Sequence, residues 1–121
     1  MDNLFKTLGD KNRLRIINLL QKGELCVCEI EAILGTTQSN VSRHLTRLRN
    51  EEIVIFEKES QWIYYQINPN FIEENKLLYE YLIDKMKRNN KFIKDLGKLS
   101  FYKESGISCE NIGELNMIDL K

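Results

Sequence analysis

The stretch GTTQSNVSRHLTRLR, residues 35–49, decides the fold of this chain. Apolar residues recur in it at helical spacing and predict a helix over about 38–49 whose buried face carries Val41, Leu45 and Leu48. The glycine and two threonines before this helix form a short turn, and another helix is expected over about 26–34. Two helices joined by a short turn that contains glycine are typical of a helix-turn-helix motif.

Residues on both sides of this motif extend the pattern. Toward the N-terminus, one short helix is expected to end at Gly9, and Asp10 is a natural N-cap for a second helix. Toward the C-terminus, the runs 53–56 and 62–67 are rich in β-branched and aromatic residues. They predict a β-hairpin with its tip at 58–61.

Helical spacing returns after the hairpin, over about 71–86 and 92–99. The resulting order, three helices, a turn, a helix, a hairpin and a helix, is that of a winged helix-turn-helix. We therefore predict a mainly α fold with a small β-hairpin, dimeric in its working form. Residues 1–100 would form the DNA-binding and dimerisation domain, and residues 101–121 an acidic C-terminal tail.

The face of the 38–49 helix opposite its apolar stripe carries polar and basic side chains suited to a DNA major groove. Arginine can bond guanine, and asparagine or glutamine can bond adenine. No acidic residue occurs in 32–50. The predicted DNA-reading residues are Ser39, Arg43 and Thr46, flanked by Asn40, Ser42 and Arg47. Predicted phosphate contacts are Gln38, Arg49 and, in the hairpin, Lys58. The only histidine, His44, lies at the edge of the apolar stripe and is expected to be packed and hydrogen-bonded.

Charge is unevenly spread although the chain has no net charge. Residues 1–50 hold eight Lys and Arg against five Asp and Glu, whereas residues 104–121 hold one against four. This bias is compatible with DNA contact by the N-terminal half. No apolar run approaches the roughly 18 residues that cross a bilayer, and the N-terminus lacks the apolar core of a signal peptide. We therefore expect a cytoplasmic protein with no membrane partner, whose three cysteines remain thiols.

Three segments together resemble the arsenical-resistance repressor family, ArsR/SmtB. They are ELCVCEI at 24–30, SNVSRHL at 39–45 and WIYY at 62–65, and the likeness covers about residues 4–86. The resemblance implies a homodimer paired through its first and last long helices. It also implies a repressor that occupies palindromic double-stranded operator DNA until an inducer binds.

The ELCVC segment makes Cys26 and Cys28 the expected inducer ligands. Thiolates select soft ions, so the inducer would be As(III), Sb(III) or a similar ion such as Cd(II) or Cu(I), with no permanent cofactor. A position near a helix N-terminus lowers the pKa of a thiol, which favours ligation. Residues at i and i+2 of a regular helix point roughly 200° apart. Both sulfurs could therefore hold one ion only if the first turn distorts. That distortion would bend the helix that supports the recognition helix, and the geometry that binds DNA would be lost.

A third ligand is left open. Arsenite-binding members of the family carry another cysteine three residues after the second, and this chain has Glu31 there. Zinc-sensing members use His and Asp on the last helix, where this chain has no His. Cys109 in the tail, from either subunit, could supply the third ligand, as could a small thiol, hydroxide or the Glu31 carboxylate.

Two other functions remain in view. A redox-sensing repressor would oxidise Cys26, Cys28 or Cys109, although a disulfide between i and i+2 is strained. A partner-binding module would bind DNA without responding to thiol reagents. An enzyme is disfavoured, because the sequence has one histidine, no Gly-rich phosphate loop, no HExxH and no clustered acid pair.

Overall fold

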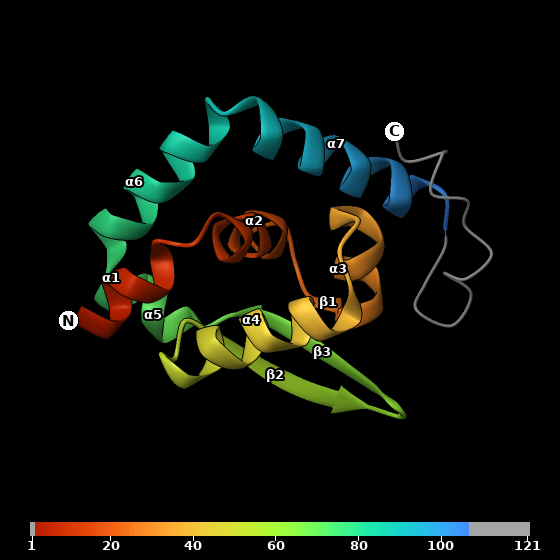
Figure 1. Ribbon diagram of the computed structural model, residues 1–121, viewed down its shortest axis with the longest axis horizontal. Helices are drawn as coiled ribbons and strands as arrows, with labels where there is room; N and C mark the ends of the chain where they lie inside the picture. The colour runs from red at the N-terminus through yellow and green to blue at the C-terminus, as the bar shows by residue number, and fades with distance from the viewer. Residues whose placement is uncertain (1, 107–121) are drawn as a thin grey trace.

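The computed structural model describes residues 2–106 of the chain (Figure 1). In chain order its elements are α1 (Asp2–Leu8), α2 (Lys11–Leu20), β1 (Leu25–Cys26), α3 (Val27–Leu34), α4 (Gln38–Asn50), β2 (Val54–Glu59), β3 (Trp62–Ile67), α5 (Pro69–Glu74), α6 (Lys76–Lys87) and α7 (Asn90–Glu104). This is the winged helix-turn-helix that the sequence predicts. The helix-turn-helix is α3 and α4, and the wing is the hairpin of β2 and β3.

Helix ends are fixed by local side chains. Asp10 caps α2, its carboxylate accepting from the backbone N–H groups of Asn12 at 2.8 Å and Arg13 at 3.1 Å. Gly35 ends α3 in the left-handed region, at φ 71°. The Thr37 hydroxyl accepts from the backbone N–H of Asn40 at 3.2 Å and so caps α4. The short turn between the two helices is therefore set by its own residues, as predicted.

The sheet holds one strand that the sequence does not reveal. Its order is β1-β3-β2, and both pairings are antiparallel. β1 pairs Cys26 with Tyr64, so Cys26 has extended backbone, φ −90° and ψ 168°, and stands just before α3 as its N-cap. For this reason α3 begins at Val27, one residue after the predicted start of about 26. The wing tip is also tighter than predicted, because β2 runs through Glu59 and leaves only residues 60–61 between the strands.

α2 lies at the centre of the molecule. α6 and α7 arch over it on one side, and α4 and the wing lie on the other (Figure 1). The predicted inward face of α4, Val41, Leu45 and Leu48, is fully buried. Burying each such side chain stabilises the fold by about 1.5–3 kcal/mol. These contacts fix which face of α4 is left for solvent.

α7 continues through Glu104. It therefore extends past residue 100, the predicted boundary between the domain and the tail. The division at 100 stays a prediction, since residues 107–121 are outside the description. No helix within residues 2–106 is long and apolar enough to cross a bilayer.

Candidate nucleic-acid interface and thiol site

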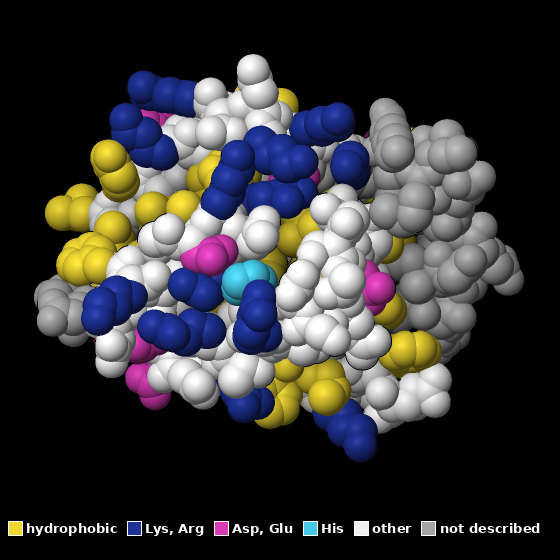
Figure 2. Space-filling model, viewed as in Figure 1, with side chains coloured by type: hydrophobic (Ala, Val, Ile, Leu, Met, Phe, Trp, Pro, Cys, Tyr) yellow, Lys and Arg dark blue, Asp and Glu magenta, His cyan; other side chains and the backbone are white. Residues whose placement is uncertain are grey.

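α4 presents the predicted polar face to solvent. Ser39, Arg43 and Thr46 are exposed, whereas Asn40 and Ser42 are half-buried. Within residues 2–106, Arg43 makes no hydrogen bond or ion pair with another side chain, so its guanidinium is available to a groove. Figure 2 shows Lys and Arg side chains gathered over α4 and the elements next to it. The face is therefore basic and rich in hydrogen-bonding groups.

Other predicted DNA contacts are held by neighbours. The Nε of Arg47 donates to the Thr7 hydroxyl of α1 at 3.1 Å, and the Arg49 guanidinium lies 5.1 Å above the centre of the Phe56 ring in the wing. Both side chains remain exposed. α1 and the wing thus orient two arginines of α4 before any ligand arrives.

Asn40 and Thr46 are oriented from within the motif. The Asn40 Nδ2 donates to the Thr36 hydroxyl at 3.3 Å, and the Thr46 hydroxyl donates to the Ser42 carbonyl at 2.9 Å. Lys58 is exposed in β2 with Glu57 and Glu59 beside it, rather than at the tip of the wing. Gln38, the first residue of α4, is exposed.

His44 is buried, as its place on the edge of the stripe predicts, with 6% of its surface exposed. Its Nδ1 lies 3.4 Å from the Nη1 of Arg13. Burial lowers the pKa of His44, and the charges of Arg13 and Arg43 lower it further against the opposing effect of Asp10. The ring is therefore neutral at pH 7 and is one of the buried side chains of α4.

Arg13 is a residue that the sequence reasoning missed. Its guanidinium donates to the Thr7 carbonyl at 2.6 Å and the Lys6 carbonyl at 3.2 Å, besides its contact with His44. One side chain of α2 thus joins the end of α1 to α4. No spacing rule marks these contacts, because Lys6, Thr7 and His44 belong to two other helices.

Cys26 and Cys28 lie together, with their Sγ atoms 3.0 Å apart. Cys26 belongs to β1 and precedes the helix, whereas Cys28 is in its first turn. The roughly 200° separation expected on a regular helix therefore does not apply. The prediction that the first turn must distort to bring the sulfurs together is wrong.

A cavity of about 240 Å³ opens beside this sulfur pair. It is lined by Cys26, Val27, Cys28, Gln38, Gln61, Trp62 and Ile63. These residues come from the start of α3, the start of α4 and the wing. A group held by the two sulfurs would therefore meet both α4 and the wing. The sequence did not single out Gln61 or Trp62 for this site.

Behind the sulfur pair, Glu29 joins the site to the last helix. Its Oε1 accepts from the backbone N–H of Cys26 at 2.9 Å, and its Oε2 accepts from the hydroxyl of Tyr102 in α7. Burial and the adjacent carboxylate raise the pKa of Tyr102. The hydroxyl therefore stays protonated at physiological pH and donates a hydrogen bond to Glu29.

Within residues 2–106, no three His, Cys, Asp or Glu side chains gather closely enough to hold a metal ion. Glu31 is thus not brought to the sulfur pair as a third ligand. Cys109 falls outside the described residues.

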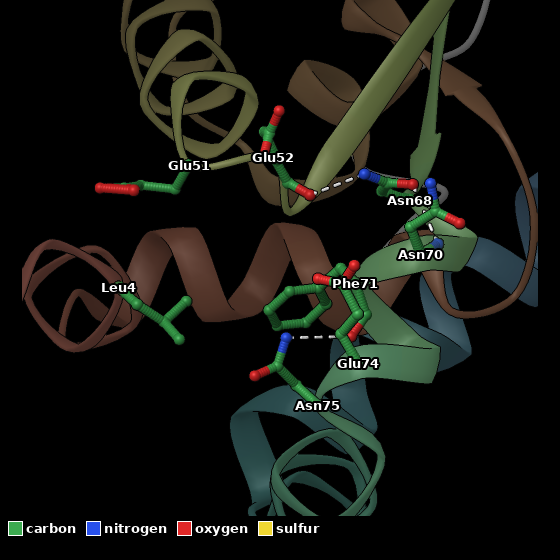
Figure 3. Close-up of a pocket in the computed structure, with 8 residues that line it drawn as sticks. All are labelled: Leu4, Glu51, Glu52, Asn68, Asn70, Phe71, Glu74 and Asn75. Carbon is green, nitrogen blue, oxygen red and sulfur yellow. Dashed lines mark hydrogen bonds between the residues drawn. The ribbon is translucent and has the colours of Figure 1, made fainter. Parts of the chain in front are cut away.

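A second pocket, of about 190 Å³, lies where the wing meets α4 and α5 (Figure 3). The Asn68 Nδ2 donates to the Glu52 carbonyl at 2.9 Å, and its Oδ1 caps α5 by accepting from Asn70 at 3.0 Å. The Asn75 Nδ2 donates to the Phe71 carbonyl at 3.2 Å. The Asn68 amide thus ties the end of the wing to the segment after α4, and the Asn75 amide bonds to a carbonyl of α5.

The comparisons agree with this arrangement. The family model described as "Bacterial regulatory protein, arsR family" matches residues 10–55. The chain is 35% identical over 94 residues to the arsenic resistance transcriptional regulator ArsR2 of Pseudomonas putida, covering 77% of this chain and 79% of that protein. It is 41% identical over 68 residues to the arsenical resistance operon repressor of Escherichia coli, covering 55% of this chain and 58% of the repressor.

Solved structures give the same fold. HlyU from Vibrio cholerae matches with a TM-score of 0.57 and 31% identity, over 65% of this chain and 87% of that one. A homodimeric winged helix-turn-helix DNA-binding domain from Mycobacterium bovis matches with a TM-score of 0.60 and 26% identity, over 69% and 78% of the two chains. The chain therefore belongs to the arsR family of bacterial regulatory proteins, and it is a DNA-binding transcriptional regulator rather than an enzyme.

Proposed function

We propose that this regulator is a homodimeric repressor that leaves its operator when As(III), or a similar soft ion, binds the thiolates of Cys26 and Cys28. The observation that carries the proposal is the 3.0 Å separation of the two Sγ atoms, which offers two soft donors to one ion. The cavity beside them reaches Gln38 of α4 and the wing. Relatives in Pseudomonas putida and Escherichia coli are regulators of arsenic resistance, which favours arsenite among the soft ions.

α4 is the proposed recognition helix, and it would lie in the major groove of the operator. Base contacts are assigned to Ser39, Asn40, Ser42, Arg43, Thr46 and Arg47. Phosphate contacts are assigned to Gln38, Arg49 and Lys58. The exposure of most of these residues and the absence of any acid in 32–50 support the assignment.

A second copy of the chain is the proposed partner. Large apolar side chains stay exposed on α1, α6 and α7: Phe5, Leu77, Tyr81, Ile93 and Phe101. Leu77 is 82% exposed, which is unusual for a leucine on an amphipathic helix. The homodimeric relative from Mycobacterium bovis and the expected pairing through first and last helices favour this use of the surface.

Cys109 is the proposed third ligand for trigonal As(III) or Sb(III). Tyr102 bonds Glu29, which itself bonds Cys26, so the C-terminal turn of α7 lies beside the sulfur pair. Cys109 lies seven positions after Tyr102, and α7 continues through Glu104. The five positions from Glu104 to Cys109 span roughly 18 Å at most when extended, which sets the greatest reach of a ligand from the same subunit.

Arsenite titration of DNA binding tests this function. Promoter DNA labelled for fluorescence anisotropy is bound by the wild type, Cys28→Ala and Cys109→Ala, and arsenite is then added. We expect arsenite to release the wild type but not Cys28→Ala, and Cys109→Ala to need a much higher arsenite concentration. A wild type that binds DNA and ignores arsenite contradicts the inducer assignment, and one that never binds DNA contradicts the role of α4.

Oxidant sensing is a second candidate, favoured by the same contact between the two sulfurs. Two thiols would give two electrons and two protons to an oxidant and form a disulfide. Intact mass after treatment separates the two functions, because oxidation removes two hydrogens whereas As(III) leaves an adduct. Release from DNA by peroxide, reversed by a reducing thiol and unaffected by arsenite, would favour this candidate over the first.

A further inference from the structure

Glu29 stands between the sulfur pair and α7, and both of its carboxylate oxygens are used. Oε1 accepts from the backbone N–H of Cys26 at 2.9 Å, and Oε2 accepts from the hydroxyl of Tyr102, 73 residues further along the chain. Glu29 is 7% exposed, and Cys26 and Tyr102 are each 2% exposed. These three buried groups form one continuous chain of hydrogen bonds.

The two bonds of Glu29 depend on each other. A buried carboxylate that loses one donor keeps an unsatisfied charge, so its position shifts toward a new partner or toward water. The donor at one end is the backbone of Cys26, the residue that carries one of the two sulfurs. Any turn of Cys26 that accompanies ion binding redirects this N–H and therefore alters the bond to Tyr102.

α7 also holds the other end of α3. The Arg15 guanidinium bonds Asp95 of α7 through Nε at 2.8 Å and Nη2 at 3.0 Å, and the same Nη2 donates to the Leu34 carbonyl at 3.3 Å. Leu34 is the last residue of α3, directly before the turn into α4. α7, which lies across α2 and α3 in Figure 1, is thus linked to both ends of α3.

We propose that Glu29 is a positioning residue, and that its hydrogen bond with Tyr102 couples the sulfur pair to α7 and through α7 to DNA affinity. The inference rests on the proposed function for the identity of the inducer. In the inducer-free protein the Cys26–Glu29–Tyr102 chain holds α3 and α7 in the arrangement that binds DNA. Ion binding at the sulfurs breaks this chain, so the DNA-bound arrangement loses its support.

Tyr102→Phe tests the proposal because it removes only the hydroxyl. Tyr79→Phe is the matched control, since Tyr79 is a half-buried tyrosine of α6 that packs edge-on against Phe71. We expect Tyr102→Phe to bind promoter DNA more weakly than the wild type when arsenite is absent. Its affinity should be closer to that of the arsenite-loaded wild type. The ratio of DNA dissociation constants with and without arsenite should fall at least roughly fivefold, within the span of allosteric couplings. Tyr79→Phe should keep the wild-type ratio.

Hydrogen exchange gives a second readout that needs no DNA. Peptides covering residues 24–30 and 95–104 should exchange faster in Tyr102→Phe than in the wild type, and arsenite should speed the same peptides in the wild type. Glu29→Gln keeps the size of the side chain and should give an intermediate effect, so it replaces Tyr102→Phe if circular dichroism shows that variant unfolded.

The outcomes separate the two proposals. A wild type released by arsenite, with Tyr102→Phe unchanged in DNA affinity, ratio and exchange, overturns the coupling and leaves the proposed function intact. A wild type that ignores arsenite overturns the proposed function. The coupling then stands if Tyr102→Phe still weakens DNA binding and speeds exchange at residues 24–30, and it is overturned if neither changes.

Discussion

The guanidinium of Arg15 and the carboxylate of Asp95 form a buried bidentate ion pair, with N–O distances of 2.8 and 3.0 Å. Arg15 is 8% exposed, and Asp95 is fully buried. The two residues are 80 positions apart, on α2 and α7. Asn18, one turn after Arg15, adds a bond from its Nδ2 to the Phe92 carbonyl at 3.0 Å. Polar contacts, besides apolar ones, therefore seat α7 on α2.

Asp95→Asn is expected to lower the free energy of unfolding by about 3 kcal/mol, because it leaves the Arg15 charge buried and uncompensated. Urea denaturation followed by circular dichroism measures this change. Asp84→Asn is the matched control, since Asp84 pairs with Arg88 at 3.0 Å on the exposed surface of α6. An exposed pair contributes at most about 1 kcal/mol. Equal effects of the two substitutions would show that the buried pair does not hold α7.

The local features of the fold were predictable because their causes lie within a few residues. The caps at Asp10 and Thr37 and the left-handed Gly35 each act on their immediate neighbours, so the sequence around them is sufficient. β1 was not predictable in this way. Two residues show no alternation, and Leu25 becomes a strand only because Tyr65, forty residues later, pairs with it.

The contacts of Arg15 and Glu29 with α7 could not be predicted from the sequence for a related reason. Polar residues between apolar ones are assigned to the solvent face, yet Arg15 and Glu29 are buried because their partners stand on α7. Only the packing of α7 over α2 and α3 brings Asp95 and Tyr102 to them. The sulfur pair was expected, but its geometry depended on the backbone of Cys26, which β1 decides.

Arg43→Ala is expected to weaken operator binding by about 1–3 kcal/mol, because an arginine on a base edge supplies that much discrimination. Arg43 is exposed on α4, so the fold should not change. Anisotropy with operator DNA and with scrambled DNA measures the loss of affinity and of specificity. Arg88→Ala, which removes an exposed arginine at the end of α6, should leave operator affinity within about twofold. A similar loss in both variants would mean that Arg43 acts through overall charge instead of through bases.

His44 makes stability depend on pH in a predictable direction. Burial lowers the pKa of His44 in the folded chain, so the folded state binds a proton more weakly than the unfolded state. The stability contributed by the neutral ring is therefore complete above the unfolded pKa, about 6.5, and is lost as the pH falls below it. We expect the difference in unfolding free energy between the wild type and His44→Gln to shrink from pH 7.5 to pH 5. Parallel curves for the two proteins over that range would refute the assignment.

Trp62 offers a direct optical test of the ligand site. It is the chain's only tryptophan, and it lines the cavity beside Cys26 and Cys28. An ion bound by the two sulfurs changes the surroundings of the indole, so arsenite should alter its emission with a stoichiometry of one ion per subunit. Mg²⁺, a hard ion that thiolates do not favour, should have no effect and serves as the control.

Cys28→Ala decides whether this signal reports ligation. The substitution removes one of the two sulfurs but leaves Trp62 and the rest of the cavity in place. The emission of Cys28→Ala should therefore stay constant at arsenite concentrations that saturate the wild type. An equal response in both proteins would place the arsenite elsewhere. A wild-type signal that appears without release from DNA would separate binding at the sulfurs from the coupling through Glu29 and Tyr102.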